Sequence, residues 1–385
     1  MVEGKNNYKC VNIYSLANAT SDVKNMSFEL FDDREFTSLV KNALPWMVQY
    51  PIILKLGLRK ILLNTLGMES RYLTFNAVDR FKKLIRREII PNIEDCNQSV
   101  IEPALKMSLK TSRKAIEDWG GNPKDITHII FITNSTFEDL SLELMKQLGL
   151  RDDVERCPML FQSFHSGLTG LRLAEQFARL NPNNRILLVM TDMLMNHAQF
   201  EDQEHMNRNN VGIHFYFSDG FTSLVIGSNE KKLDGESKGL VEVLPGKTTI
   251  IPDSTDYLGL KLHHNSISIN ATESLKDKVP PNLLPFARKL VDGCPVFLPS
   301  TDVYNFEYIL HPGLPVVYEA NSKQSKNDLR FTITAYKKFG HASVSSVFFV
   351  LEESLNPNAV WKHEYGFLMS FGVGLTTEGS IIRKI

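Results

Sequence analysis

Short apolar segments alternate with amphipathic segments along the first 230 residues, and no other feature restricts the fold as strongly. Residues 126–134 (ITHIIFITN) and 185–191 (RILLVMT) are brief apolar runs, which is typical of strands buried on both faces. Residues 141–150 and 167–180 instead repeat apolar residues at helical spacing, which predicts helices. Strands that alternate with helices predict an α/β sheet covered by helices on both faces.

Two features extend this pattern over the whole chain. A helix is expected at 101–119, because Pro103 lies near its start and Gly120-Gly121 follow its end. The polar segment 229–239 (NEKKLDGESKG) is the predicted boundary between two halves of similar design, residues 1–230 and 231–385. In the second half we expect strands at 240–244 and 306–310, a helix at 283–290, a buried helix or strand at 345–351, and a terminal hairpin of 365–370 with 375–382.

The charge balance argues against partners that are recognised by charge alone. The chain has 385 residues, with 43 basic and 44 acidic side chains and a formal net charge of −1. Proteins that bind nucleic acid or an anionic membrane concentrate positive charge. The composition therefore favours neither partner.

The four cysteines and the first twenty residues indicate a cytoplasmic protein. Cys10, Cys96, Cys157 and Cys294 lie far apart, without the spacing of a zinc site, and are expected to be reduced thiols. The first twenty residues lack a basic region followed by a sustained apolar core, so we expect no signal peptide. His263-His264 is expected to be a polar pair rather than part of a metal site.

Residues 44–67 (LPWMVQYPIILKLGLRKILLNTLG) form a strongly apolar stretch. Three basic residues interrupt this stretch, and Pro51 and Gly57 break its helical pattern. A membrane-spanning helix needs about 20 mostly apolar residues. The stretch is expected to form a core or tunnel wall, or else a contact surface for a lipid-like chain or a carrier protein, but no membrane span.

Three groups of residues resemble plant chalcone synthases and bacterial type III polyketide synthases, which are relatives of the initiating ketoacyl synthases. The first group runs from residue 126 to 174 and includes MLFQSFHSGLTGLRLA (159–174). The second is Phe217-Ser218-Asp219-Gly220, similar to a Phe-Gly-Asp-Gly motif of the family. The third comprises HPGLP (311–315), FGHASVSSVFFVLEE (339–353) and SFGVGLTTE (370–378).

This resemblance implies a fold and a type of site. The family has the thiolase fold, a five-layer αβαβα arrangement of two duplicated halves, and forms dimers. Its buried site is reached by a tunnel for the pantetheine arm of coenzyme A or of an acyl carrier protein. A cysteine at a helix N-terminus, a histidine and an asparagine perform its chemistry. No tightly bound cofactor and no metal are implied.

The resemblance carries over only in part, because Phe164 occupies the position of the family's nucleophilic cysteine. The family histidine is matched by His311, and His341 stands where the family has asparagine. A phenyl ring cannot attack a thioester, so covalent loading at residue 164 is excluded. Two neutral imidazoles can still donate hydrogen bonds to an enolate, or one can act as a base.

Other nucleophiles and other pocket residues remain open. Ser163 or Ser166 is an alternative nucleophile, as is Cys157, whereas His165 is expected to pack or cap at the first turn of a helix. Residues matched to the wall of the family's cavity are Ser163, His165, Ser166, Phe200, Phe217, Ser343, Phe371, Gly372 and Gly374. The candidate residues for binding the phosphates of coenzyme A are Arg59, Lys60 and Arg71.

Three functions are compatible with the sequence. The first is a ketosynthase-like enzyme of secondary metabolism that acts on an acyl or polyketide thioester, or a similar intermediate, by condensation, acyl transfer or cyclisation, without a covalent cysteine intermediate. The second is a non-catalytic subunit that pairs, as a heterodimer, with an active cysteine-bearing ketosynthase. The third is a binding protein for a hydrophobic metabolite. The two histidines favour the first, and Phe164 favours the second.

Overall fold

The computed structural model describes residues 10–20, 23–25, 71–73, 77, 79–80, 83, 88–89, 92–197, 217–263, 265, 267–272, 274–313 and 328–385. The apolar stretch 44–67 and the predicted site residues Arg59, Lys60 and Phe200 lie outside these ranges. Arg71 lies in a short strand, but its side chain is not among those described.

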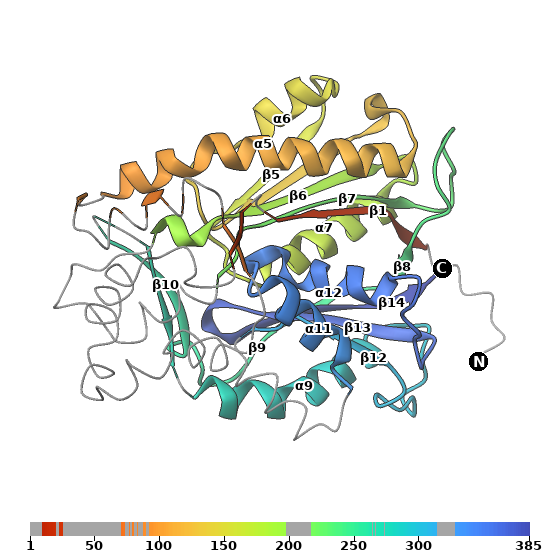
Figure 1. The fold of residues 1–385 in the computed structure, drawn as a ribbon. Helices are drawn as coiled ribbons and strands as arrows, with labels where there is room; N and C mark the ends of the chain where they lie inside the picture. Colours follow the sequence, from red (N-terminus) through yellow and green to blue (C-terminus); the bar gives the residue numbers. More distant parts are fainter. Residues whose placement is uncertain are drawn as a thin grey trace.

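The described chain forms five layers (Figure 1). Helices α5 (Ile93–Trp119) and α6 (Ser141–Leu148) cover the outer face of the first group of strands, and α9 (Leu275–Asp292) covers the outer face of the second group. Between the two groups lie α7 (Ser166–Leu180), α11 (Arg330–Phe339) and α12 (Ser346–Leu355). This αβαβα order is the one that the resemblance implies.

The strands of both groups belong to one ten-stranded sheet, in which β8 (Val241–Val243) is the connection. β8 pairs antiparallel with β1 on one side and with β14 on the other. The first group comprises β1 (Val11–Ala19), β7 (Gly220–Ser228), β6 (Arg185–Asp192), β4 (His128–Thr133) and β5 (Glu155–Leu160). The second comprises β12 (Glu307–Leu310), β13 (Tyr365–Phe371), β14 (Thr376–Lys384) and β9 (Lys247–Ile250).

Pairing within each group is mixed. β4 is parallel to β5 and β6, whereas β6, β7 and β1 are antiparallel. In the second group β12 and β13 are parallel, and β13 and β14 form the expected antiparallel hairpin. Two small sheets lie apart from these: β2 (Val23–Asn25) with β3 (Arg71–Leu73), and β10 (Leu258–Leu262) with β11 (Ile267–Ala271). The division of the chain at residue 230 stays a prediction.

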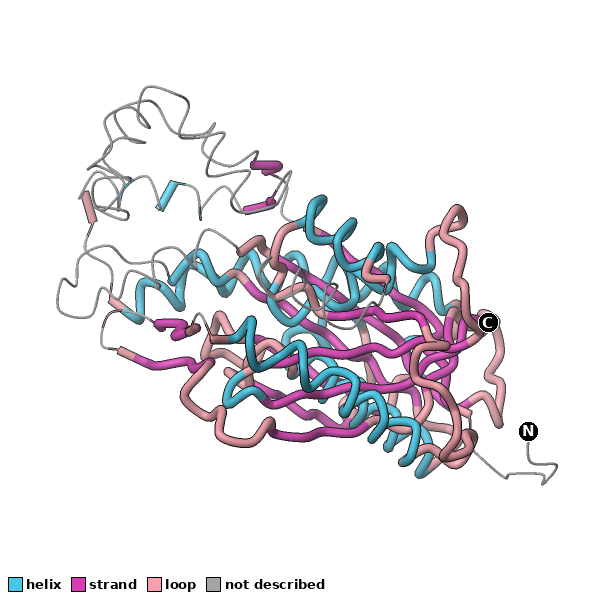
Figure 2. The backbone as a smooth tube through the Cα atoms, turned by 90° about the horizontal axis from the view of Figure 1, so that it is seen from below, coloured by secondary structure: helices cyan, strands magenta, loops and turns pink. Residues whose placement is uncertain are grey.

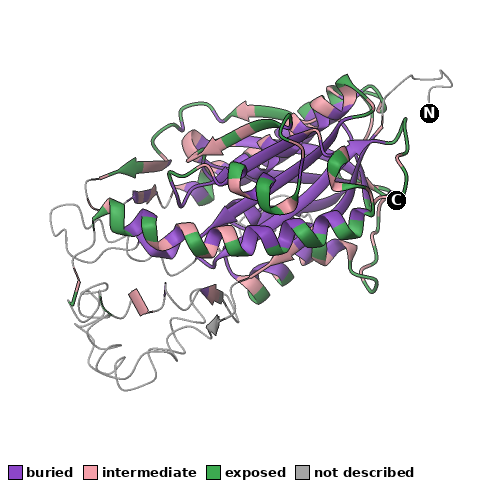
Figure 3. Ribbon diagram, turned by 90° about the horizontal axis from the view of Figure 1, so that it is seen from above, coloured by how far each residue is buried: buried purple, intermediate pink, exposed green. Residues whose placement is uncertain are grey.

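Burial explains why the sequence pattern is so regular. The central strands are almost entirely buried, whereas the long helix α5 has one buried and one exposed face (Figure 3). The long helices run roughly along the strands (Figure 2). In the middle layer, apolar residues of α7 and α12 pack together between the two groups of strands. Each fully buried Leu or Phe side chain contributes roughly 1.5–3 kcal/mol.

Two helices begin earlier than the sequence predicts. α5 starts at Ile93, not near Pro103, because Asn92 and Asp95 form a capping box at its first turn. α9 starts at Leu275 rather than at 283, although Pro280, Pro281 and Pro285 lie inside it. Its buried face packs on β14 and β9, and this packing outweighs the loss of the proline N–H groups.

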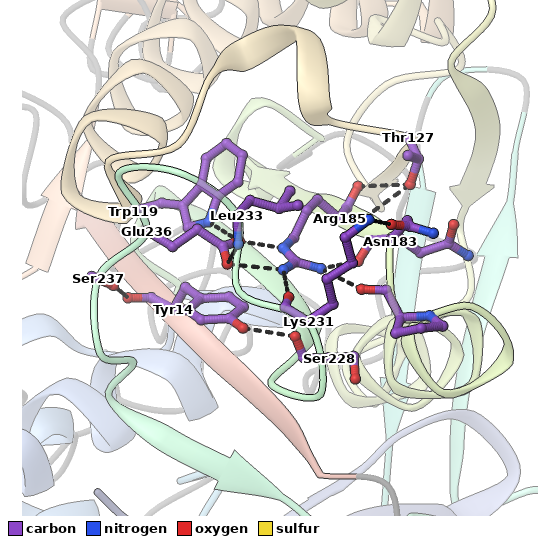
Figure 4. A network of polar contacts seen from close by, with 12 residues as sticks. Tyr14, Trp119, Thr127, Asn183, Arg185, Ser228, Lys231, Leu233, Glu236 and Ser237 are labelled. Atoms are coloured by element: carbon purple, nitrogen blue, oxygen red, sulfur yellow. Dashed lines mark hydrogen bonds and ion pairs between the residues drawn. The ribbon is translucent and has the colours of Figure 1, made fainter.

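A buried ion pair holds the segment between β7 and β8. Arg185 on β6 and Glu236 are both fully buried, and their charged groups are in direct contact (Figure 4). The indole N–H of Trp119 donates to Glu236 at 2.9 Å, and Arg185 donates to the carbonyl of Lys231 at 2.7 Å. The polar segment 229–239 is therefore fixed to the first half of the fold at its Glu236.

Candidate active site

Phe164 lies in a tight turn that joins β5 to α7. Ser163, the residue before it, has a φ of 75°, a left-handed conformation that is costly for a residue other than glycine. Two hydrogen bonds hold this turn: the N–H of Ser163 donates to Asn134 Oδ1 (2.8 Å), and its Oγ accepts from the N–H of Val373 (3.0 Å). The turn places Phe164 two residues before the first turn of α7.

The buried carboxylate of Asp192 supports the turn by holding Asn134. Asp192, at the end of β6, is completely buried and accepts hydrogen bonds from the backbone N–H and the Nδ2 of Asn134, at 2.5 and 3.1 Å. Thr133 Oγ1 donates to the same carboxylate at 3.2 Å. Burial raises the pKa of Asp192 above its usual value. The roles of Asn134 and Asp192 were not predictable from the sequence, because nothing in an isolated Asn or Asp shows that it holds a turn.

The two histidines come from the second half of the chain. His311 follows β12, and its backbone N–H donates to the carbonyl of Met369 on β13 (2.8 Å). His341 follows α11 and forms an isolated parallel bridge with Phe217, while the N–H of Ser218 donates to the carbonyl of His341 (2.9 Å). The two imidazole centroids lie 4.8 Å apart, so the predicted pair is assembled.

Backbone amides fix the tautomer of both imidazoles. Nδ1 of His311 accepts from the N–H of Gly313, and Nδ1 of His341 accepts from the N–H of Ser343, each at 3.1 Å. A backbone N–H can only donate, so Nδ1 carries no hydrogen in either ring. Both neutral imidazoles therefore carry their hydrogen on Nε2. In His311 this Nε2–H donates to the carbonyl of Ser343 at 3.0 Å.

Burial keeps both rings neutral. His311 and His341 are only 2% and 3% exposed. Burial lowers the pKa of His311 to about 4. Burial and then the charge of His311 lower the pKa of His341 well below its usual value. At neutral pH the two rings are hydrogen-bond donors and not cations.

The ring of Phe164 fills the space in front of the two imidazoles. Its centroid lies 5.0 Å from that of His341, 6.2 Å from that of His311 and 5.7 Å from that of Phe217. Phe164 is 5% exposed. These contacts bring together the three residues that sequence analysis placed at the centre of the site.

A small apolar cavity remains beside these rings. Its volume is about 30 Å³, which is room for roughly two water molecules. The cavity is lined by Phe164, Phe217, Leu258, Ile269, Ala271, Leu275, His311, Gly313, His341 and Phe371. Apart from the two imidazoles, the side chains that line the cavity are apolar. A polar group that enters the cavity can therefore form hydrogen bonds mainly with the histidines.

Several residues matched to the family's cavity wall do not reach this cavity. Ser163, His165, Ser166, Ser343, Gly372 and Gly374 are absent from its lining. Ser166 Oγ donates to the carbonyl of Ser163 at 2.6 Å, so this hydroxyl caps the turn. Phe217 and Phe371 line the cavity, and Phe200 lies outside the described residues.

The wall on the opposite side of the cavity was not predicted from the sequence. The β10–β11 hairpin contributes Leu258, Ile269 and Ala271, and Leu275 comes from the first turn of α9. The alternation of buried and half-buried residues along β11 signals a strand with one packed face. That pattern does not show which part of the molecule the face packs against.

The described residues contain neither a metal-ligating cluster nor a membrane-spanning helix. Among them there is no group of three or more His, Cys, Asp or Glu side chains that could hold a metal ion. No helix in these parts of the chain is both long and apolar enough to cross a membrane.

Comparison with known proteins identifies the family. Residues 58–230 match the N-terminal domain of chalcone and stilbene synthases, and residues 242–385 match the C-terminal domain. Type III polyketide synthases A and B of Arabidopsis thaliana are each 26% identical to the chain, over 337 and 308 residues. These matches cover 84% and 77% of this chain, and 82% and 76% of the relatives.

A solved structure shows the same fold. The C-terminal type III polyketide synthase domain of Steely1, a type I/III hybrid from Dictyostelium, matches with a TM-score of 0.83 and 21% identity. The match covers 98% of this chain and 99% of that one. The chain has the thiolase fold and belongs to the chalcone and stilbene synthase family of biosynthetic condensing enzymes.

Proposed function

We propose that the protein is a ketosynthase-like enzyme of secondary metabolism that acts on an acyl or polyketide thioester without forming a covalent acyl-enzyme. The observation that carries this proposal is the pair of neutral imidazoles beside the cavity, both with the hydrogen on Nε2. Donors of this kind stabilise negative charge that develops on a carbonyl oxygen. Backbone amides set the positions of both rings. To bind the charge, the Nε2–H of His311 exchanges its hydrogen bond to the carbonyl of Ser343 for one to the substrate oxygen.

The chemistry assigned to the site is oxyanion stabilisation. When a malonyl-type thioester loses CO₂, the electron pair of the broken C–C bond moves onto the thioester carbonyl oxygen and leaves an enolate. When a second substrate attacks a thioester carbonyl, the same oxygen becomes the anion of a tetrahedral intermediate. An Nε2–H donor in an apolar cavity stabilises either anion more strongly than it would in water.

Among the described residues, no side chain at the site offers a nucleophile for acyl loading. Phe164 has none, Ser163 Oγ accepts from Val373, and Ser166 Oγ donates to a backbone carbonyl. Cys157 lies on β5 and is not part of the cavity lining, and burial raises the pKa of its thiol. A raised pKa leaves less of the reactive thiolate at neutral pH.

The carrier, the compartment and the assembly are parts of the same proposal. The substrate is attached to pantetheine, either of coenzyme A or of an acyl carrier protein, and the protein works in the cytoplasm as a dimer. The match to a family of biosynthetic condensing enzymes supports a thioester as the substrate. The phosphates of coenzyme A are proposed to bind to Arg59, Lys60 and Arg71.

Incubation with thioesters tests the proposal. Purified protein is mixed with malonyl coenzyme A and a panel of acyl coenzyme A thioesters, and mass spectrometry follows both the small molecules and the intact protein. Thioester loss without an acyl adduct, abolished in His311→Ala or His341→Ala, is the expected result. An acyl adduct on the protein contradicts it and points to a serine or to Cys157.

A second candidate function is that of a non-catalytic subunit. Its supporting observation is that Phe164 fills the space in front of both imidazoles. On this hypothesis the chain pairs with a cysteine-bearing ketosynthase and has no turnover alone. Turnover that appears only after co-purification with such a partner would favour it.

The apolar lining of the cavity also fits a third candidate, a binding protein for a hydrophobic metabolite. On this hypothesis the protein binds a small apolar compound but turns over no thioester, with or without a partner. Extraction of the purified protein with organic solvent, followed by mass spectrometry, would detect such a compound.

A further inference from the structure

The side chain of His165 lies between the Phe164 turn and the end of β13. Residues 371–374 (Phe371-Gly372-Val373-Gly374), the Phe371 loop, lead from β13 toward β14. A Cβ atom on Gly372 would lie 2.2 Å from Nδ1 of His165 and 3.1 Å from its Cγ. The imidazole is therefore packed directly against the backbone of this loop.

Nδ1 of His165 is buried in this contact without a hydrogen bond. Within the described part of the chain, no group donates to this nitrogen or accepts from it. The side chain of His165 does not cap α7 either, although the residue stands at the N-cap position. A buried polar atom without a partner is uncommon in folded proteins and needs an explanation.

Two hydrogen bonds join the same two segments on either side of this contact. The N–H of Val373 donates to Oγ of Ser163 at 3.0 Å, and Oγ of Ser370 donates to the carbonyl of Phe164 at 3.2 Å. Phe371, between Ser370 and Gly372, is part of the cavity lining. The position of the Phe371 loop therefore determines one wall of the cavity.

The charged groups beside His165 come from α7 and β14. His165, Thr169 and Arg172 lie on one face of α7, since they are four and seven residues apart. Thr169 and Arg172 both donate to the carboxylate of Glu378 on β14, at 3.0 and 2.7 Å. The Phe371 loop carries no titratable side chain, and the Phe164 turn carries none besides His165. Burial, and then the charge of Arg172, lower the pKa of His165 to about 4, so the packed ring is neutral at pH 7.

Proton uptake by His165 favours any state in which the ring leaves the loop. A solvated histidine has a pKa of about 6.5, whereas the packed ring has a pKa of about 4. The packed state is favoured above pH 6.5 and loses its advantage as the pH falls toward 4. With these two pKa values, release of the ring is about 10-fold more favourable at pH 5.5 than at pH 7.5.

We propose that His165 is a pH-sensitive switch: its neutral ring holds the Phe371 loop against the Phe164 turn, and protonation of the ring releases the loop. Because Phe371 lines the cavity, release of the loop also opens the cavity that the two site histidines line. The switch controls access to the site and does not depend on which reaction takes place there.

Hydrogen exchange followed by mass spectrometry measures release of the loop in the full chain without any substrate. The N–H of Gly372 donates to the carbonyl of Thr376 at 2.9 Å, and that of Val373 donates to Ser163. After correction for the intrinsic exchange rate, protection of the peptide 370–376 should be about 10-fold lower at pH 5.5 than at pH 7.5. β6, which is buried along its whole length, should stay more strongly protected at both pH values, because the loop opens locally.

Variants assign the pH dependence to one residue. His165→Phe keeps an aromatic ring but cannot take up a proton, so protection of the loop should be the same at both pH values. His165→Gln provides a second side chain that does not titrate. His128→Phe is the matched control and should keep the wild-type pH dependence, since His128 is buried, stacks on Phe177 and is absent from the cavity lining.

Two results would overturn the proposal. Equal protection of the wild-type loop at pH 7.5 and 5.5 contradicts it, whether or not the variants fold. A loss of protection in His165→Phe as large as in wild type also contradicts it. Such a loss would assign the pH dependence to another group, such as His311, whose ring lies 6.0 Å from that of Phe371. Because no thioester is used, either result leaves the proposed function unaffected.

Discussion

The ring of Phe164 stands edge-on to the imidazole of His341, with 5.0 Å between the ring centroids and an interplanar angle of 72°. The same ring lies nearly parallel to His311, at 25°. Phe164 is thus packed against both donors of the site. Its replacement should change the chemistry as well as the stability.

Replacing Phe164 by cysteine should allow covalent acylation. The variant places a thiol close to the N-terminus of α7, where the helix dipole favours the thiolate. Intact-mass spectrometry after incubation with acyl coenzyme A should show a single acyl adduct that the wild-type protein lacks. Phe164→Ala opens the same space without a thiol, so an adduct on that variant would reveal a serine nucleophile instead.

The alanine variant should also be less stable. Removing a buried phenylalanine ring costs about 3–5 kcal/mol, and the existing cavity beside Phe164 is small. Urea unfolding monitored by circular dichroism measures the loss. A cost below about 1 kcal/mol would show that the ring contributes little packing.

Acid should destabilise the protein between pH 6.5 and 4. Burial lowers the pKa of His197 to about 4, while an unfolded histidine has a pKa of about 6.5. In that interval the unfolded state binds a proton that the folded state does not, so stability falls as the pH falls. His197 accounts for about 3 kcal/mol of the loss by pH 4, and above pH 6.5 its contribution is constant.

Urea unfolding of wild type and His197→Asn at pH 7, 6 and 5 checks this sign. The variant should be less stable than wild type at pH 7, because it loses the 2.8 Å hydrogen bond between Nε2 and the carbonyl of Ser135. Its stability should fall less steeply with acid. Parallel curves for the two proteins would contradict the lowered pKa.

Removing one partner of the Arg185–Glu236 pair should cost about 3–5 kcal/mol, because the other charge stays buried and unpaired. Both side chains are completely buried. Glu236→Gln and Arg185→Met test this by urea unfolding, and the double variant Arg185→Met, Glu236→Leu should recover part of the loss. Arg151→Ala breaks an exposed pair with Asp153 and should cost no more than about 1 kcal/mol.

The order of strands and helices was predictable because burial leaves a regular pattern in the sequence. Residues 185–191 consist of apolar residues flanked by a basic residue and a threonine, and β6 is buried along its whole length. The start of α5 was missed although Asn92 and Asp95 carry the capping signal. Pro103 suggests a helix start, yet proline can also occur inside a helix that tertiary packing stabilises.

The site was predictable only where a family pattern marks it. Phe164, His311 and His341 lie far apart in sequence and were brought together by the resemblance alone. The hydrogen bond from Nε2 of His311 to the carbonyl of Ser343 depends on the φ of Ser343, which is 50°. This conformation cannot be predicted from the residue type, since tertiary contacts force the serine into the left-handed region.

Gly372 should be the more sensitive of the two glycines in the loop that follows β13. A Cβ atom at Gly372 would lie 2.2 Å from Nδ1 of His165 and 2.9 Å from Oγ of Ser163, so the loop must move away from the Phe164 turn. Gly372→Ala should therefore cost about 1–3 kcal/mol and lower thioester turnover, because Phe371 lines the cavity.

Gly374→Ala is the matched control for this loop. Gly374 has a φ of 66°, and its nearest neighbour would be Thr255 Cα at 4.0 Å. An alanine Cβ at this position has no close neighbour, but the left-handed backbone costs about 1–2 kcal/mol. We expect both variants to lose stability in urea and only Gly372→Ala to lose turnover. Equal turnover in the two variants would mean that the contact of Gly372 with the Phe164 turn does not shape the site.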